Sequence, residues 1–336
     1  MLNRRTLLAA AAGIGLAVTA PAATLAAEPL KVVASFSILG DMVQEIGGDA
    51  ISVTTLVGPD GDAHVYEPTP ADASSIASAD VLVVNGLDFE TWLPRLVSAA
   101  GFKGVEVVAS AGITPRAFDE HDDDDHGADA HDHHDHDDHD QGHGAAGHGG
   151  HDHHPGHHHG PDDPHAWQSL ANGVIYARNI AAALAAADPE NAATYEANAA
   201  GYIAALEALD AEVTAAFAAI PADRRKVVTS HDAFGYFGDA YGVEFIAPTG
   251  VSTEAEASAA DVARIIDQIR HDNIAAVFVE NISDTRLIEQ IANETGAVVG
   301  EPLFSDALSG PDGPAPTYLD MFRWNTEQLA GALGTS

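Results

Sequence analysis

Two blocks of alternating strand and helix patterns, separated by a long alanine-rich stretch, constrain the fold of this chain more than any other feature. The first block has short apolar runs at residues 30–36, 51–57, 80–86 and 105–110. The second has them at residues 226–231, 243–248, 274–280 and 297–302. Apolar runs of this length, with helical patterns between them, are typical of parallel α/β units. The sequence therefore predicts an α/β protein with two similar lobes, each a four-stranded, mostly parallel sheet with flanking helices.

The alanine-rich stretch predicts how the lobes are joined. Asp188 and Pro189 divide it into two helices, and the second carries an apolar stripe formed by Tyr195, Tyr202, Leu206, Leu209 and Val213. A helix of about 30 residues is roughly 45 Å long, enough to run along both lobes. We expect an N-terminal lobe at 28–187, a linker helix at 188–220 and a C-terminal lobe at 221–336. A ligand would then lie between the lobes, where the parallel strands end.

The N-terminus predicts export. Residues 1–27 have Arg4 and Arg5, an apolar stretch, and small residues suited to cleavage after Ala26 or Ala27. The arginine pair fits a twin-arginine signal as well as a general secretory one, so the route stays open. The chain has no cysteine, which excludes disulfides, thiolate ligands and lipidation of an N-terminal cysteine. We expect a soluble periplasmic protein without a lipid anchor.

The charge of the chain indicates which partners it can have. The formal net charge is -37, and the segment 119–163 contains no lysine or arginine. Nucleic acid and anionic lipid need clustered basic residues, so neither is an expected partner. A cation is the natural counterpart of such a chain.

Most of the 19 histidines lie in one insert, between residues 121 and 159. The insert lacks apolar residues, so we expect a disordered loop at about 119–163. Closely spaced histidines with flanking aspartates can bind several Zn²⁺ ions weakly. We predict auxiliary weak sites at His131, His133, His134, His136, His139, His151, His153, His154, His157, His158 and His159. The loop would collect zinc, sense its excess, or dock a periplasmic zinc metallochaperone.

Four histidines lie outside the insert, and three of them stand at strand ends or in loops. These three, His64, His165 and His231, are candidates for one metal site, because neutral imidazole is a good Zn²⁺ ligand and a tetrahedral site needs four groups. The fourth group would be Asp306 or Glu280, which both follow apolar runs of the second block. Position alone does not separate these two carboxylates. His271 lies in a polar stretch and is predicted to be a surface residue.

Four motifs in order carry a family resemblance: "HVYEP" at 64–68, "DPHAW" at 163–167, "SHDAF" at 230–234 and "FSDAL" at 304–308. With their surroundings they closely resemble the zinc and manganese substrate-binding proteins of bacterial ABC transporters, of the periplasmic cluster A-I type. The resemblance covers nearly all of the chain between the export signal and the C-terminus, apart from the insert. It implies two α/β lobes joined by a rigid linker helix, with the metal held between them.

The resemblance also implies a ligand set. His64, His165, His231 and Asp306 occupy the ligand positions of the four motifs, and Glu280 becomes a supporting residue. Three histidines with one carboxylate favour zinc, whereas manganese-type members tend to have a carboxylate at the position of His231. Some zinc members carry a glutamate immediately before the first ligand, where this chain has Ala63. This departure favours Asp306, or a water molecule, as the fourth ligand.

The predicted function is therefore high-affinity zinc binding and delivery to an ABC permease in the inner membrane, by a monomer without enzymatic activity. Manganese binding is the alternative within the family. A zinc hydrolase or lyase is the rival outside it, but the sequence has no H-E-x-x-H motif, and a carboxylate in the fourth position would close the site to water. Glu67 and Asp232, which follow ligand histidines in their motifs, are candidates for orienting those rings, together with Glu280.

Overall fold

A four-stranded parallel sheet forms the centre of each lobe, and the two sheets have the same strand order. The computed structural model describes residues 28–117, 162–254, 256–274 and 276–335. In the first lobe the order is β2-β1-β3-β4, with bounds Leu30–Phe36 (β1), Ile51–Val57 (β2), Val81–Val84 (β3) and Val105–Val108 (β4). In the second it is β6-β5-β7-β8, with bounds Lys226–Val228 (β5), Glu244–Ile246 (β6), Ala276–Val277 (β7) and Val298–Val299 (β8). Each predicted apolar run supplies one strand, which confirms the predicted fold class.

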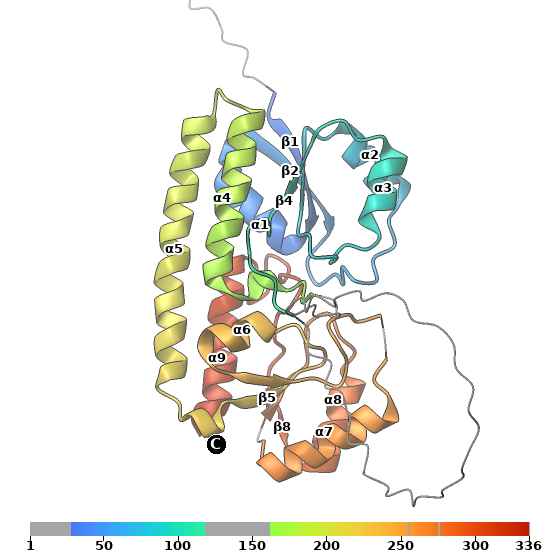
Figure 1. Ribbon diagram of the computed structural model, residues 1–336, viewed down its shortest axis with the longest axis vertical. Coiled ribbons are helices and arrows are strands. Elements are labelled where there is room, and N and C mark those ends of the chain that lie inside the picture. Colours follow the sequence, from blue (N-terminus) through green and yellow to red (C-terminus); the bar gives the residue numbers. More distant parts are fainter. Residues whose placement is uncertain (1–27, 118–161, 255, 275, 336) are drawn as a thin grey trace, which may run out of the picture.

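Helices flank the two sheets, and one long helix extends from the first lobe to the second (Figure 1). Up to the end of the long helix they are α1 (Ser37–Gly47), α2 (Pro70–Ser78), α3 (Leu93–Ala100), α4 (Leu170–Ala187) and α5 (Ala192–Ala218). After it they are α6 (Gly235–Tyr241), α7 (Ala259–Asp272), α8 (Arg286–Thr295) and α9 (Tyr318–Thr335). Helix α4 is long and apolar enough to cross a membrane, but it packs against α1 and α5 as a core helix of the first lobe.

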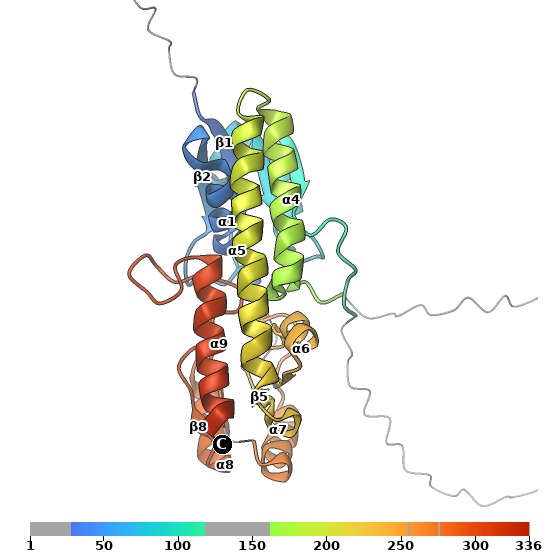
Figure 2. The ribbon, with the colours of Figure 1, turned by 90° about the vertical axis from the view of Figure 1, so that its left-hand side faces the viewer.

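Helix α5 extends along both lobes, with α4 beside its first half and α9 beside its second (Figure 2). The predicted stripe is the face that it buries, and Ala199 and Phe217 complete that face. The helix begins at Ala192 and not at Asp188, because the Asp188 carboxylate accepts hydrogen bonds from Asn191 (2.7 Å) and Tyr195 (2.8 Å) and so stabilises a turn there. One continuous core follows α5 through both lobes. Movement of one lobe against the other would therefore disturb apolar packing.

The strands of the second lobe are shorter than the apolar runs that predicted them. Just beyond β5 the backbone forms hydrogen bonds with a side chain instead of a neighbouring strand. The N–H groups of Ser230 and His231 both donate to Oε1 of Glu280 at 2.9 Å. Single bridges, His231 to Thr249 and Glu280 to Leu303, continue the pairing beyond the regular ladder. The strand ends of this lobe are therefore shaped by buried polar groups.

Candidate metal centre

Four side chains from separate loops meet between the two lobes. His64 follows β2, His231 follows β5 and Asp306 follows β8, while His165 lies just before α4. Their potential ligand atoms all lie within 4.8 Å of one another. All four are buried, with exposed fractions of 7% for His64, 0% for His165, 1% for His231 and 0% for Asp306. The structure thus brings together the four residues that the sequence motifs singled out.

Four of the distances within this cluster are close to those between the ligand atoms of a tetrahedral metal site. From the Asp306 carboxylate, Oδ2 lies 3.2 Å from Nε2 of His64 and 3.2 Å from Nε2 of His231, and Oδ1 lies 3.5 Å from Nε2 of His165. The Nε2 atoms of His64 and His165 are 3.4 Å apart. Metal bonds of 2.0 to 2.1 Å at tetrahedral angles place the ligand atoms about 3.3 to 3.4 Å apart.

Several polar atoms of the cluster lack a hydrogen-bond partner within the described part of the chain. They include both carboxylate oxygens of Asp306 and Nε2 of His231, all of which are buried. Buried polar atoms are costly unless they are paired or coordinate a metal. A cation at the centre of the cluster would contact all of these atoms at once, so the donor set fits a metal ion.

The charges of the cluster shift the pKa values of its members. Burial alone lowers the pKa of His165, but the charge of Asp306 and the hydrogen bond to Asp163 outweigh it and raise that pKa to about 9. For His231, burial is likewise outweighed by Glu280 and Asp306, which raise its pKa well above the usual value. Burial raises the pKa of Asp306, yet His165 and His231 hold it well below its usual value. The metal-free site therefore holds protons that a metal ion must displace.

Buried carboxylates fix the orientation of two of the histidine rings. The Nδ1 atom of His165 lies 2.8 Å from Oδ1 of Asp163, and Nδ1 of His231 lies 2.6 Å from Oε2 of Glu280. Each contact turns Nε2 toward the centre of the cluster, which is the usual arrangement behind ligand histidines. Glu280 thus lies behind His231, whereas Asp306 faces the centre.

His64 is oriented by its backbone and by packing. Its N–H donates to Oδ1 of Asp62 at 2.9 Å, and its ring packs edge-on against Phe89, with ring centres 4.8 Å apart. Oδ2 of Asp62 accepts a hydrogen bond from Thr253 of the second lobe at 2.7 Å. The loop that carries His64 is therefore connected to the opposite lobe.

The loop that carries Asp306 is held by residues of the first lobe. Trp167 and Gln168 both donate to the carbonyl oxygen of Ser305, at 2.9 Å and 2.7 Å. The N–H of Leu308 donates to Oγ of Ser37 at 3.0 Å. These contacts position the one candidate ligand of the cluster that is a carboxylate.

Sequence reasoning missed Asp163 as a supporting residue. Asp163 precedes His165 by two positions, as Asp62 precedes His64, and in both cases Oδ1 of the aspartate accepts the N–H of the histidine, at 3.0 Å and 2.9 Å. The spacing Asp-x-His in "GDAH" and "DPHAW" is a signal that could have found both aspartates, since short aspartate side chains bond to the backbone two residues on.

Two predicted supporting residues form no hydrogen bond to a ring of the cluster within the described part of the chain. Glu67 is exposed, and its position in the loop after His64 turns it toward solvent. Asp232 is half-buried, and its backbone N–H pairs with Gly250 at 3.1 Å. Within the described residues, neither carboxylate hydrogen-bonds to a ring of the cluster. His271 is an exposed residue of α7, paired with Asp272 at 2.7 Å, and the auxiliary histidines at 131–159 lie outside the described residues.

A cavity of about 460 Å³ reaches the cluster from the second lobe. His231 forms part of its wall, together with Asp62, Thr253, Glu256 and Asp284. Since the cluster itself is buried, this cavity brings solvent close to a candidate ligand, and its wall carries acidic groups that attract cations.

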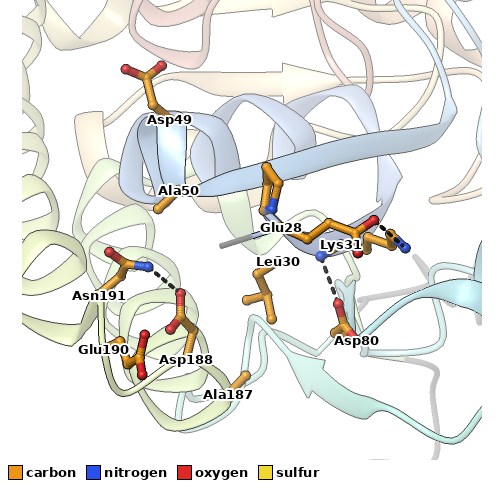
Figure 3. A pocket seen from close by; sticks show the side chains of 11 residues that line it. Glu28, Leu30, Lys31, Asp49, Ala50, Asp80, Ala187, Asp188, Glu190 and Asn191 are labelled. Atoms are coloured by element: carbon orange, nitrogen blue, oxygen red, sulfur yellow. Dashed lines mark hydrogen bonds and ion pairs between the residues drawn. The ribbon is translucent and has the colours of Figure 1, made fainter. Parts of the chain in front are cut away.

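Another cavity, of about 560 Å³, lies at the opposite end of the first lobe (Figure 3). It is near the N-terminal ends of β1 and β3, whereas the cluster lies where strands end. Its carboxylates include Asp80, which accepts the N–H of Lys31 at 2.9 Å, and Asp188, which accepts from Asn191 and Tyr195. Among the described residues that line it there is no histidine. This acidic hollow therefore does not share the donor chemistry of the cluster.

Comparisons with known proteins give relatives over nearly the whole chain. The family model ZnuA, described as the periplasmic component A of a zinc-uptake complex, matches residues 32–332. The iron-binding protein YfeA of Yersinia pestis is 33% identical over 309 residues, which cover 92% of this chain and 88% of that protein. The manganese transporter lipoprotein PsaA of Streptococcus pneumoniae is 30% identical, with coverage of 91% and 89%. The solved structure of the periplasmic zinc-binding protein TroA of Treponema pallidum is similar with a TM-score of 0.75 and 27% identity, covering 91% of this chain and 99% of that one.

Proposed function

This chain belongs to the ZnuA family of periplasmic metal-binding components of ABC transporters, and from that premise we propose that it binds one zinc ion between its lobes and delivers it to a membrane permease. The members of this family are components of transporters and are not enzymes. A substrate-binding component releases its cargo unchanged, so zinc is here the substrate.

The proposed ligands are His64, His165, His231 and Asp306, and the observation that carries the proposal is their buried, closely spaced cluster. Three imidazoles and one carboxylate suit zinc, because nitrogen donors bind Zn²⁺ more tightly than Fe²⁺ or Mn²⁺. The names of the relatives include iron, manganese and zinc binders, so the choice of metal rests on this donor argument. Manganese is the second candidate, supported by PsaA.

A competition titration tests the choice of metal. The metal-free mature protein without residues 121–159 is loaded with Mn²⁺ and titrated with Zn²⁺ against a chelator of known affinity. We expect zinc to be preferred by about 10²-fold or more, as nitrogen-rich sites prefer it. The variant His231→Asp, with two imidazoles and two carboxylates, should show a smaller preference. Equal or tighter binding of Mn²⁺ by the unaltered protein would refute zinc as the substrate.

Zinc binding should release protons at neutral pH. Because the pKa of His165 is raised to about 9 and that of His231 is raised as well, their rings keep protons at pH 7 that ligation must displace. The apparent affinity should therefore fall steadily as the pH decreases below about 9. Calorimetry at pH 7 in buffers of different ionisation enthalpy should give about one to two protons released per zinc. A binding heat that is the same in every buffer would contradict this.

The His-rich insert is proposed to supply auxiliary weak sites for zinc capture, sensing or transfer, or to dock a metallochaperone. Its histidines lie outside the described residues, so the support is its composition. Deletion of residues 121–159 should leave one tight site and remove the weaker ones, as counted by equilibrium dialysis with Zn²⁺. Loss of the tight site in the deletion variant would show that the insert supplies its ligands.

The protein is an extracytoplasmic component with a permease as its partner, as its family implies. We further propose that it is soluble, monomeric and not lipidated, unlike the relatives that are named lipoproteins. The absence of cysteine from the sequence supports the lack of a lipid anchor, because bacterial lipoproteins are anchored through an N-terminal cysteine.

A further inference from the structure

Arg116 lies beside the carboxylate that orients His165. Its Nη1 atom is 3.5 Å from Oδ2 of Asp163, and its carbonyl oxygen accepts the N–H of Asp163 at 2.8 Å. The neighbouring residues Ala117 and Asp162 form an antiparallel bridge. Two segments that are distant in the sequence are thus joined immediately behind the metal cluster.

Asp163 uses its two oxygens differently. Oδ1 contacts the backbone N–H and Nδ1 of His165, at 3.0 Å and 2.8 Å. Oδ2 is buried and has no hydrogen-bond partner within the described residues. Among them, Arg116 is the basic residue whose side chain lies within 4.0 Å of this oxygen. A buried carboxylate oxygen needs a countercharge, and Arg116 supplies it.

Arg116 also contacts the second lobe. Its Nε atom donates to Oδ2 of Asp239 at 3.1 Å, and its backbone N–H donates to Oη of Tyr236 at 2.8 Å. Tyr236 in turn donates to the carbonyl oxygen of Asp163 at 3.2 Å. Helix α6, which carries Tyr236 and Asp239, approaches closely at Gly235, where a Cβ atom would lie 2.6 Å from both Nη1 of Arg116 and Oδ2 of Asp163.

We propose that Arg116 is a positioning residue of the metal site. By neutralising Oδ2 of Asp163 it holds Oδ1 on the ring of His165, and by binding Asp239 it couples this ligand of the first lobe to the second lobe. The inference rests on the proposed function, since it assumes that His165 is a ligand. Arg116, which is not itself a proposed ligand, should therefore affect how tightly the metal is bound.

The test compares Zn²⁺ affinity and the visible absorption spectrum of bound Co²⁺ in the full-length mature protein. For Arg116→Ala we expect about tenfold weaker zinc binding and an altered cobalt spectrum, since supporting residues typically contribute about 10- to 100-fold. Arg116→Lys should recover part of the affinity, because a point charge can neutralise Oδ2 without spanning both aspartates. Asp239→Asn should keep the cobalt spectrum, since Asp163 retains its countercharge. Arg95→Ala, which removes an exposed arginine, is the matched control and should bind as the unaltered protein does.

The outcomes separate this inference from the ligand assignment. Unchanged affinity and spectrum in Arg116→Ala, together with weakened binding in His231→Ala, overturn the inference alone. Unchanged binding in both variants overturns the ligand set and the inference with it. If Arg116→Ala fails to fold by circular dichroism, Gly235→Ala decides instead: its methyl group should displace the Arg116–Asp163 pair and weaken zinc binding, and unchanged binding overturns the proposal.

Discussion

Replacing Asp306 by alanine should weaken zinc binding by about 10²- to 10³-fold. Structural zinc sites with four ligands bind with about 10 to 16 kcal/mol, so one ligand contributes roughly a quarter, or about 3 to 4 kcal/mol. Asp306 also supplies the negative charge that Nε2 of His64 and of His231 face at 3.2 Å. Competition with a zinc chelator measures the loss.

The control for this variant is Asp312→Ala, which removes an exposed carboxylate from the same C-terminal region. It should leave zinc affinity unchanged. Asp306→Asn, which keeps the shape but not the charge, should lie between the two. Retention of zinc affinity within tenfold in Asp306→Ala would mean that water or Glu280 serves as the fourth ligand, contrary to the proposed set.

Replacing Glu280 by alanine should lower the free energy of unfolding of the metal-free protein by about 3 to 5 kcal/mol, the usual cost of breaking a buried ion pair. The carboxylate is 1% exposed, lies 2.6 Å from Nδ1 of His231, and accepts the N–H groups of Ser230 and His231. Its loss leaves these donors buried without an acceptor. Urea denaturation measures the change, and zinc affinity should fall by about 10- to 100-fold in the same variant.

Two variants define the source of this effect. Glu280→Gln keeps an oxygen for the two backbone N–H groups and should cost less stability, while losing the charge that faces His231. Glu289→Ala removes an exposed glutamate of α8 and should be neutral within about 0.5 kcal/mol. A loss below 1 kcal/mol in Glu280→Ala would show that Glu280 does not support His231.

Much of the fold could be predicted because its signals are local. Each apolar run became a strand, and the stripe from Tyr195 to Val213 is the face that α5 buries. The early end of β5 could not be predicted, because the N–H groups of Ser230 and His231, just beyond it, donate to Glu280, which is distant in the sequence. Helix α5 begins four residues after the predicted bound of 188, because a local turn at Asp188 is stabilised by side-chain hydrogen bonds from Asn191 and Tyr195.

The candidate ligands could be found because isolated histidines at strand ends are conspicuous beside parallel sheets. Position could not separate Asp306 from Glu280, since both follow strands of the second lobe. The direction of each side chain separates them in space: Asp306 faces three imidazoles, and Glu280 lies behind one. Supporting residues were harder to predict. Glu67 and Asp232 follow candidate ligand histidines in the sequence, but the carboxylates that contact the rings are those of Asp163 and Glu280.

The most direct test of the proposed metal centre is anomalous diffraction at the zinc absorption edge from crystals of the zinc-loaded protein without residues 121–159. We predict one strong peak between the lobes, about 2.0 to 2.2 Å from Nε2 of His64, His165 and His231 and from a carboxylate oxygen of Asp306. A peak elsewhere, or one that lacks any of these four residues in its coordination, would contradict the ligand set.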